Sequence, residues 1–167
     1  MTQLAYYVNG IGVKTTVPTT GTFIASYFDK TVKIGGKDVK GVDRPIVYSN
    51  IKNAVGSLGW LVDNNTKATT TDVTITARTA FGYTADKVAY AIVVDGSQAE
   101  YSNGMSISNL ADIMACLGVV DAVNMNGGAS SSVTIRDASQ KVWKSLSKPT
   151  TGKEASIGNG LAFVVKD

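Results

Sequence analysis

Hydrophobic and polar residues alternate along much of this chain, and such alternation predicts a protein built mainly from β-strands. Residues 72–81 follow a period of two, so that Val73, Ile75 and Ala77 share the apolar face of the expected strand. Arg78 then lies on the opposite face of that strand.

The next part of the chain predicts two strands around a helix. Residues 88–94 are more continuously apolar, which indicates a more buried strand, and residues 119–125 form the next one. Between them, residues 106–117 have the spacing of an amphipathic helix, with Ser106 as its N-cap and Gly118 in the left-handed position after its end. Its expected core stripe consists of Leu110, Ile113, Met114 and Leu117.

The remaining segments predict short strands and turns. The N-terminal third is expected to be mostly strand, and a second helix is considered near residues 51–58. The other expected features are core residues 60–62, a turn at 63–67, a hairpin from 131–136 and 141–145, and a closing strand at 161–165. The chain is therefore predicted to be an α+β single domain over residues 1–167, with a mixed, mostly antiparallel β-sheet and one or two packed helices.

Size and charge narrow the class of protein. A chain of 167 residues with 44% hydrophobic and 17% charged residues fits one domain with a substantial core. The net charge is +3, and the densest basic cluster, residues 30–40, is interrupted by two glycines and Asp38. This cluster is typical of a solvated hairpin, so we expect no nucleic-acid partner.

The absence of histidine excludes several catalytic mechanisms. Ser-His-Asp and Cys-His catalysis are impossible, and the commonest zinc ligand is missing. The single cysteine, Cys116, cannot form an internal disulfide and is expected to be a buried structural thiol beside Leu117. Without histidine, acid–base chemistry falls to Asp, Glu, Lys or Tyr. We expect no cofactor and recognise no metal motif, although Asp and Asn side chains at the glycine-rich turn could coordinate a hard cation through oxygen.

The N-terminal residues lack the basic and apolar regions of a secretory signal, and no segment is long and apolar enough to span a bilayer. These features predict a cytoplasmic protein without a membrane partner. The small size and the Thr/Ser/Gly/Asn-rich composition also suit a phage product made in the host cytoplasm, or a component of the virion.

Residues 123–132 form the stretch most indicative of function. A short apolar run ends in two glycines and three serines, which together place backbone and side-chain hydrogen-bond donors at one turn. Such a turn predicts a lip that binds an anion or a sugar at the end of a strand, whereas the competing interpretation is a polar loop between strands. The residues concerned are Asn124, Asn126, Gly127, Gly128, Ser130 and Ser131.

Several motifs occur in a fixed order before this turn. They are Arg-Thr-Ala-Phe-Gly at 78–82, Val-Asp-Gly at 94–96, a Ser/Gly-rich turn at 101–106 before a helix, and Asn-Met-Asn-Gly-Gly at 124–128. In this order they resemble the phosphodiester glycosidase family, most strongly over residues 78–132. The resemblance implies a reaction that cleaves the bond between the anomeric carbon of a sugar and a phosphodiester oxygen.

The resemblance also implies roles for individual residues. Arg78 would grip the phosphate through its guanidinium group, and Asp95 would act as base, nucleophile or orienting group. Asn126 would occupy the third catalytic position, whereas Asp121 is expected to be structural. The implied substrate-binding residues are Thr79, Gly96, Ser102, Asn124, Gly127, Gly128, Ser130 and Ser131.

Two positions depart from the family pattern. Asn126 stands where the family carries an aspartate, and Ala129 replaces a third glycine. An amide can hold a ligand but cannot exchange a proton as a carboxyl group does. Three interpretations therefore remain open: a phosphodiester glycosidase, a catalytically silent relative that binds a glycan, sugar phosphate or nucleotide-like ligand, and a structural module of a phage or other particle that assembles as a homo-oligomer.

Overall fold

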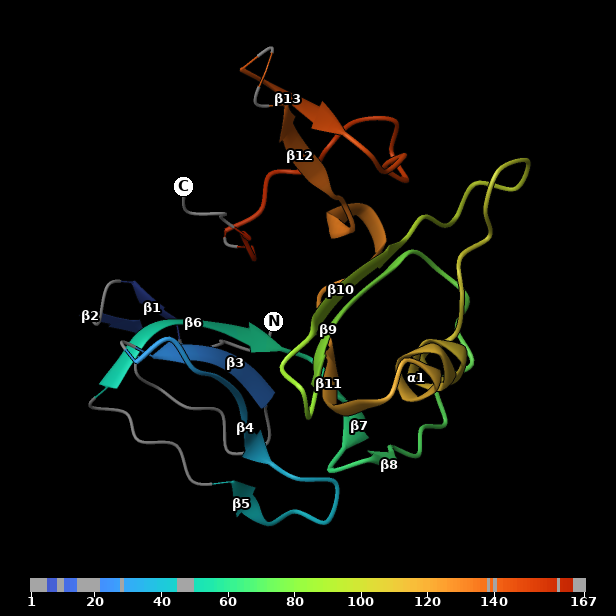
Figure 1. Cartoon of the computed structure of the whole chain (residues 1–167). Coiled ribbons are helices and arrows are strands. Elements are labelled where there is room, and N and C mark those ends of the chain that lie inside the picture. The colour runs from blue at the N-terminus through green and yellow to red at the C-terminus, as the bar shows by residue number, and fades with distance from the viewer. Residues whose placement is uncertain are drawn as a thin grey trace.

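The computed structural model describes residues 6–8, 11–14, 22–27, 29–44, 50–137, 139, 141–158 and 160–163. Within these residues, two antiparallel β-sheets stack on each other, one α-helix covers the outer face of the second sheet, and a β-hairpin stands above it (Figure 1). The predicted α+β class is confirmed, and all the described strand pairs are antiparallel.

The N-terminal third forms a six-stranded sheet, as its predicted strand content requires. Its strands, in the order β2-β1-β6-β3-β4-β5, are β1 (Tyr6–Val8), β2 (Ile11–Lys14), β3 (Thr22–Tyr27), β4 (Val32–Lys37), β5 (Asp43–Arg44) and β6 (Ile51–Ser57). The helix considered near residues 51–58 is wrong, because this segment is β6 and pairs with β3 from Thr22 to Tyr27.

The second sheet has five strands and carries the segments that were singled out for function. Its strands, in the order β10-β9-β11-β7-β8, are β7 (Gly59–Asp63), β8 (Thr66–Lys67), β9 (Arg78–Thr84), β10 (Ala89–Val94) and β11 (Val119–Asn124). Strand β10 lies at the edge of this sheet, so the expectation that it is the more buried strand is wrong.

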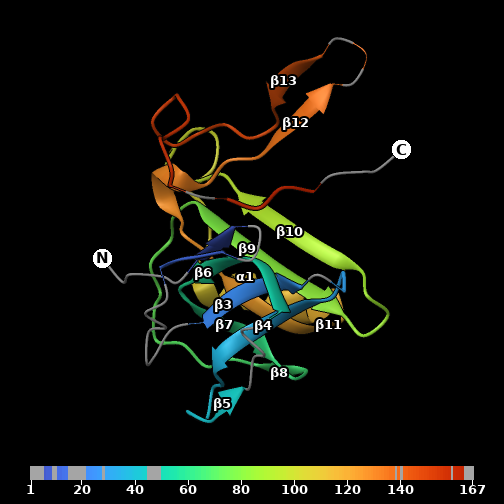
Figure 2. The same cartoon turned by 90° about the vertical axis from the view of Figure 1, so that its left-hand side faces the viewer.

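Two hydrophobic clusters give the layers their order, from the six-stranded sheet through the five-stranded sheet to the helix (Figures 1 and 2). One cluster packs Ala80 and Ala122 of the five-stranded sheet against Leu110 and Met114 of the helix α1 (Ile107–Cys116). The other packs the opposite face against the six-stranded sheet; its buried members are Ile24, Ile34, Val55, Phe81, Val123 and Met125. Alternate residues of β9 and β11 therefore face different layers.

Helix α1 forms where the apolar spacing predicted it. The Ser106 hydroxyl accepts a hydrogen bond from the Asn109 amide, and Gly118 has φ +71°, so both predicted end signals are confirmed. Leu110 and Met114 are fully buried, as expected, whereas Leu117 is 37% exposed. The apolar stripe that contacts the sheet is thus narrower than predicted.

Two predictions of burial near the end of this helix are wrong. Ile113 is 37% exposed, and Cys116 is exposed rather than a buried structural thiol. Both lie off the strip formed by the buried Leu110 and Met114, toward solvent. A spacing of three and four residues predicts an apolar side of the helix, but it does not show which of those residues touch the sheet.

The strand predicted for residues 72–81 begins later than expected. Residues 72–77 contribute a single bridge, between Thr76 and Met105, and β9 starts at Arg78. Val73 is 82% exposed, so the apolar face expected at the start of this segment is wrong. Likewise, residues 161–163 are not in a strand, and the rest of the expected closing strand lies outside the described residues.

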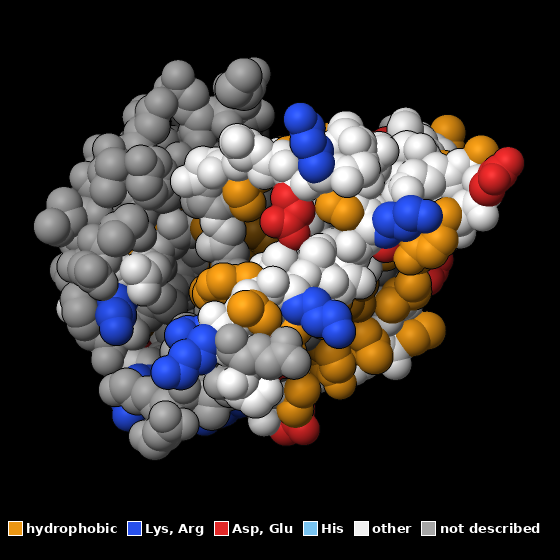
Figure 3. Space-filling view, turned by 90° about the horizontal axis from the view of Figure 1, so that it is seen from above, with side chains coloured by type: hydrophobic (Ala, Val, Ile, Leu, Met, Phe, Trp, Pro, Cys, Tyr) orange, Lys and Arg blue, Asp and Glu red, His pale blue; other side chains and the backbone are white. Residues whose placement is uncertain are grey.

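The predicted hairpin is confirmed as β12 (Thr134–Asp137) and β13 (Val142–Ser145). It projects from the rest of the fold, and its side chains are largely exposed (Figure 1). Seen from above, the described surface carries apolar side chains with separate single charges rather than a block of one sign (Figure 3). No described helix has the length and apolar character needed to cross a membrane.

A buried ion-pair network ties β5 to the five-stranded sheet. Arg44 pairs with Asp63 and, at 2.8 and 2.9 Å, with both carboxylate oxygens of Asp121. Asp121 also accepts hydrogen bonds from the Tyr83 hydroxyl at 2.8 Å and the Asn64 amide at 3.0 Å. The structural role expected for Asp121 is thereby explained.

Candidate functional site

The motif-bearing segments meet at one end of the five-stranded sheet. Strands β10 and β11 flank β9 and both run antiparallel to it, with Val94 opposite Arg78 and Asn124 opposite Ala80. The residues that follow β10 and β11 therefore lie beside the start of β9. Register brings together the segments at residues 78–82, 94–96 and 124–128, which are distant in the sequence.

The glycine-rich turn is held against β9 by hydrogen bonds. The Met125 amide donates to the Thr79 carbonyl at 2.8 Å, and the Gly128 amide donates to the Ala77 carbonyl at 2.9 Å. The 3₁₀-helix η2 (Gly128–Ser130) follows, and its end is closed by the Ser131 amide donating to Gly128. Some of the backbone N–H groups that were predicted to bind a ligand thus donate hydrogen bonds within the protein instead.

Two side-chain hydrogen bonds organise the polar groups of this turn. The Asn126 Nδ2 donates to the Ser130 Oγ at 3.2 Å, and the Thr79 Oγ1 donates to the Ser131 Oγ at 3.2 Å. Ser131 is buried, whereas Asn126 is exposed. The two bonds are separate: one joins Asn126 to Ser130 of η2, and the other joins Thr79 of β9 to Ser131, directly after η2.

Three glycines allow other loops to pack against residues 76–77. A Cβ atom on Gly127 would lie 2.8 Å from the Ala77 carbonyl oxygen, and one on Gly96 would lie 2.7 Å from the Thr76 carbonyl carbon. Gly104 also packs against Thr76 and has φ +93°. The predicted binding glycines Gly96 and Gly127 thus have a packing reason that does not involve a ligand.

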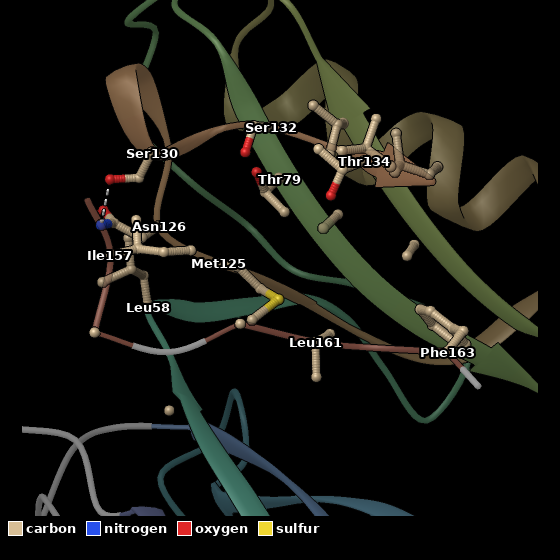
Figure 4. Close-up of a pocket in the computed structure, with 18 of the residues that line it drawn as sticks. Leu58, Thr79, Met125, Asn126, Ser130, Ser132, Thr134, Ile157, Leu161 and Phe163 are labelled. Carbon is tan, nitrogen blue, oxygen red and sulfur yellow. Dashed lines mark hydrogen bonds between the residues drawn. The ribbon is translucent and has the colours of Figure 1, made fainter. Parts of the chain in front are cut away.

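A cavity of about 1060 Å³ opens beside this turn, on the face of the five-stranded sheet opposite the helix. Thr79, Asn126 and Ser130 line it, and Figure 4 shows their polar groups toward one side of the cavity. The described residues that line it include no charged side chain: they are Gly56, Leu58, Thr79, Ala80, Ala91, Ile92, Val93, Met125, Asn126, Ser130, Ser132, Val133, Thr134, Ser156, Ile157, Gly158, Gly160, Leu161 and Phe163.

Arg78 lies at this end of the sheet but on the helix-facing side. It follows the alternation of β9, in which Arg78 and Ala80 share a face and Thr79 points the other way. Its guanidinium donates to the carbonyls of Met105 at 3.1 Å and Thr74 at 2.5 Å, and lies 3.7 Å from the Asp72 carboxylate. The side chain is buried and does not line the cavity.

Asn124 is also buried at this end of the sheet and does not line the cavity. Its Oδ1 has no hydrogen-bond partner among the described residues. The alternation of β11 places Asn124 on the same side of the sheet as Ala122, which packs against the helix. Of the two predicted asparagines, Asn126 alone reaches the cavity within the described structure.

Asp95 sits beyond the end of β10, under the segment that follows the hairpin. Its Oδ2 accepts hydrogen bonds from the Lys148 amide at 2.9 Å and the Tyr101 hydroxyl at 3.2 Å, and the bond from Tyr101 raises the pKa of that phenol. Its Oδ1 is buried without a partner among the described residues. Ser102 Oγ donates to the Asp95 carbonyl at 2.6 Å, so it shapes the loop, and neither residue lines the cavity.

Sequence reasoning missed one wall of the cavity. Residues 156–158 and 160–163 have no regular secondary structure, yet Ser156, Ile157, Leu161 and Phe163 line the cavity. Nothing in their spacing indicated a binding surface, because their position depends on the path of the chain after the hairpin. Within the described residues no group of three His, Cys, Asp or Glu side chains is arranged to hold a metal ion.

Comparisons with a family model and with solved structures both give matches. Residues 5–164 match the model of the phosphodiester glycosidase family. The structure is similar to the catalytic domain of zebrafish N-acetylglucosamine-1-phosphodiester alpha-N-acetylglucosaminidase, auto-inhibited by its pro-peptide, with a TM-score of 0.67 and 18% sequence identity. That match covers 89% of this chain and 51% of the zebrafish chain, so this chain spans about half the length of that one. Comparison with curated protein sequences gave no match.

Proposed function

Because this chain belongs to the phosphodiester glycosidase family, we propose that its cavity binds a sugar-1-phosphate diester and that the chain cleaves the bond between the anomeric carbon and the phosphate oxygen. The observation that carries this proposal is the meeting of Thr79, Asn126 and Ser130 at one side of the cavity. These residues come from the segments whose order is characteristic of the family.

The chemistry of the proposed reaction suits such a surface. The leaving group is a phosphate monoester, which departs more readily than the alcohol of an ordinary glycoside and needs less protonation. Hydroxyl and amide groups donate hydrogen bonds to sugar hydroxyls and phosphate oxygens. In this proposal, Thr79, Ser130 and Asn126 orient the sugar phosphate at the end of β9 and β11.

We also propose the roles predicted from the sequence for two charged residues, Arg78 and Asp95. Arg78 would have to exchange the carbonyls of Thr74 and Met105 for phosphate oxygens in order to grip the ligand. Asp95 has one carboxylate oxygen without a described partner, but a role as base requires the loop around it or the segment from Lys148 to rearrange.

A second candidate function is a catalytically silent site that binds the same diester. It is favoured by the uncharged lining of the described cavity. It is also favoured by Asn126, at the position where the resemblance to the family implies an aspartate. An amide at this position preserves shape and hydrogen bonding but cannot transfer a proton. The two candidates share the ligand and differ only in turnover.

The test is release of free sugar from a panel of sugar-1-phosphate diesters. We expect the unaltered protein to turn over at least one diester, and Arg78→Ala and Asp95→Asn each to lower kcat/KM by about 100-fold or more if they act on phosphate and proton. Asn109→Asp, an exposed Asn-to-Asp change on the helix, serves as the matched control for Asn126→Asp.

Each result of this panel separates the candidates. Turnover by the unaltered protein supports the hydrolase and shows that a carboxylic acid at position 126 is not essential. Turnover by Asn126→Asp but not by the unaltered protein or Asn109→Asp supports the silent binder. Absence of turnover by every variant, with no thermal stabilisation by any diester, would contradict both candidates.

A further inference from the structure

We propose that the side of the cavity opposite the hydroxyl groups binds an uncharged, apolar group beyond the phosphate, so that the substrate class is a sugar-1-phosphate diester of an alkyl or aryl alcohol. This inference rests on the proposed function, since it assigns the second half of the same ligand. It is carried by the distribution of polar and apolar side chains around the cavity.

The cavity has two chemically different sides. Figure 4 shows Thr79, Ser130 and Ser132 with their hydroxyl groups on one side, and Met125, Leu161 and Phe163 along the other. The sugar and its phosphate match the first side, because they need hydrogen-bond donors and acceptors. The second side offers thioether, aliphatic and aromatic surface to whatever lies beyond the phosphate.

The absence of charge among the described lining residues limits what this second side accepts. A charged group taken out of water needs an opposite charge or several hydrogen bonds to compensate for its lost hydration. The lining supplies neither at Met125, Leu161 and Phe163, so an ammonium or carboxylate in the alcohol esterified to the phosphate is disfavoured there. An alkyl chain or aromatic ring pays no such penalty.

Two of the apolar side chains that line the cavity are also left largely uncovered by the protein itself. Phe163 is 63% exposed and Ile157 is 52% exposed, although both border a concave space. The Phe163 ring lies 6.4 Å from the ring of Phe81, centroid to centroid, so one edge of it is anchored on the five-stranded sheet while the rest faces outward. An apolar ligand would remove this surface from water, which is the main favourable contribution to such binding.

The test uses three diesters of N-acetylglucosamine 1-phosphate that differ only in the alcohol: methyl, octyl and 2-aminoethyl. Binding is measured by titration calorimetry on the full chain, below the concentration at which the octyl ester forms micelles. We expect the octyl diester to bind about tenfold more tightly than the methyl diester because it buries additional apolar area, and the aminoethyl diester to bind no more tightly than methyl.

Variants locate this preference. Phe163→Ala should reduce the ratio of octyl to methyl affinity about fivefold, because the ring contributes apolar area beyond the phosphate. The matched control is Trp143→Ala, which removes an exposed aromatic side chain on the hairpin that does not line the cavity. Both substitutions are at exposed positions, so neither should prevent folding.

The outcomes distinguish this inference from the function on which it rests. Binding of the methyl diester without any octyl advantage, or an octyl advantage that survives Phe163→Ala, would overturn the apolar assignment and leave the proposed function in place. Binding of none of the three diesters would overturn both. An octyl advantage lost in Phe163→Ala and kept in Trp143→Ala would support the apolar assignment.

Discussion

Residues 76–77 show how single glycines determine the end of the five-stranded sheet. Gly96 and Gly104 belong to the loop between β10 and α1, Gly127 follows β11, and all three pack against this short stretch of backbone. Each position leaves no space for a Cβ atom, because the atoms that it would meet belong to the main chain and cannot rotate away. The glycines of the motifs therefore support the geometry of the candidate site through packing.

Gly96→Ala tests this packing without the added effect of an unusual backbone angle, because the left-handed region is not involved at Gly96. We expect the free energy of unfolding to fall by about 3 kcal/mol, since the new methyl group forces the backbone at Thr76 to move. Urea denaturation measures the change. Gly59→Ala is the control, because nothing lies within 4 Å of its Cβ position; equal losses in the two variants would refute the packing argument.

At the scale of elements, Tyr83 connects β9 to the Asp121 carboxylate on β11, and Arg44 of β5 joins the same carboxylate from the other sheet. Burial, together with the hydrogen bond to Asp121, raises the pKa of the Tyr83 phenol well above its usual value of 10.0. The phenol thus stays protonated as the donor of this hydrogen bond throughout the neutral range.

This raised pKa predicts a pH-dependent contribution to stability. The folded state holds the Tyr83 proton more tightly than the unfolded state, so the contribution is present below about pH 10 and is lost as the pH rises toward the folded pKa. We expect Tyr83→Phe to lower the free energy of unfolding by about 1 kcal/mol near pH 8, and this difference to shrink by about pH 11. Urea denaturation at several pH values checks it, with Tyr90→Phe on β10 as the control; a difference that is constant with pH would contradict the assignment.

The elements that could be predicted are those whose signals lie within their own sequence. The helix at 106–117 carries its cap and its apolar spacing within its own sequence, so both its existence and its ends were predicted. Residues 51–58 show the reverse case, because Ile51, Ala54, Val55 and Leu58 have helical spacing although the segment is β6. Its pairing with β3 and β1 decided the outcome, and such pairing is not written in the segment itself.

For the candidate site, the sequence predicted which segments meet but not which side chains line the cavity. The order of the motifs predicted which segments belong together, and the sheet register brings them to one end. The face on which each side chain lies was not predictable, because the expected strand at 72–81 begins only at Arg78 and the apolar alternation before it does not face a core. Arg78 and Thr79 are neighbours in the motif, yet only Thr79 lines the cavity.

For the whole molecule, the two sheets share one hydrophobic cluster and are expected to unfold together. Ile24 and Val55 of the six-stranded sheet pack with Phe81 and Val123 of the five-stranded sheet, and all four are buried. The ion pairs from Arg44 to Asp121 join the same sheets along another edge. Neither sheet retains a complete core when the other is removed, which favours a single cooperative transition.

Ile24→Ala tests this cooperativity from the six-stranded sheet, at a residue that does not line the cavity. We expect a loss of about 2–5 kcal/mol in the free energy of unfolding, because the substitution leaves a void between the sheets. The unfolding midpoint measured by the fluorescence of Trp60, on β7 of the other sheet, should shift together with the midpoint measured by far-ultraviolet circular dichroism of the whole chain. Both are measured in a Trp143→Phe background, which leaves Trp60 as the single tryptophan. Val32→Ala, at a 42% exposed position on β4, is the control. A Trp60 transition that stays in place while the circular dichroism moves would show that the five-stranded sheet folds independently.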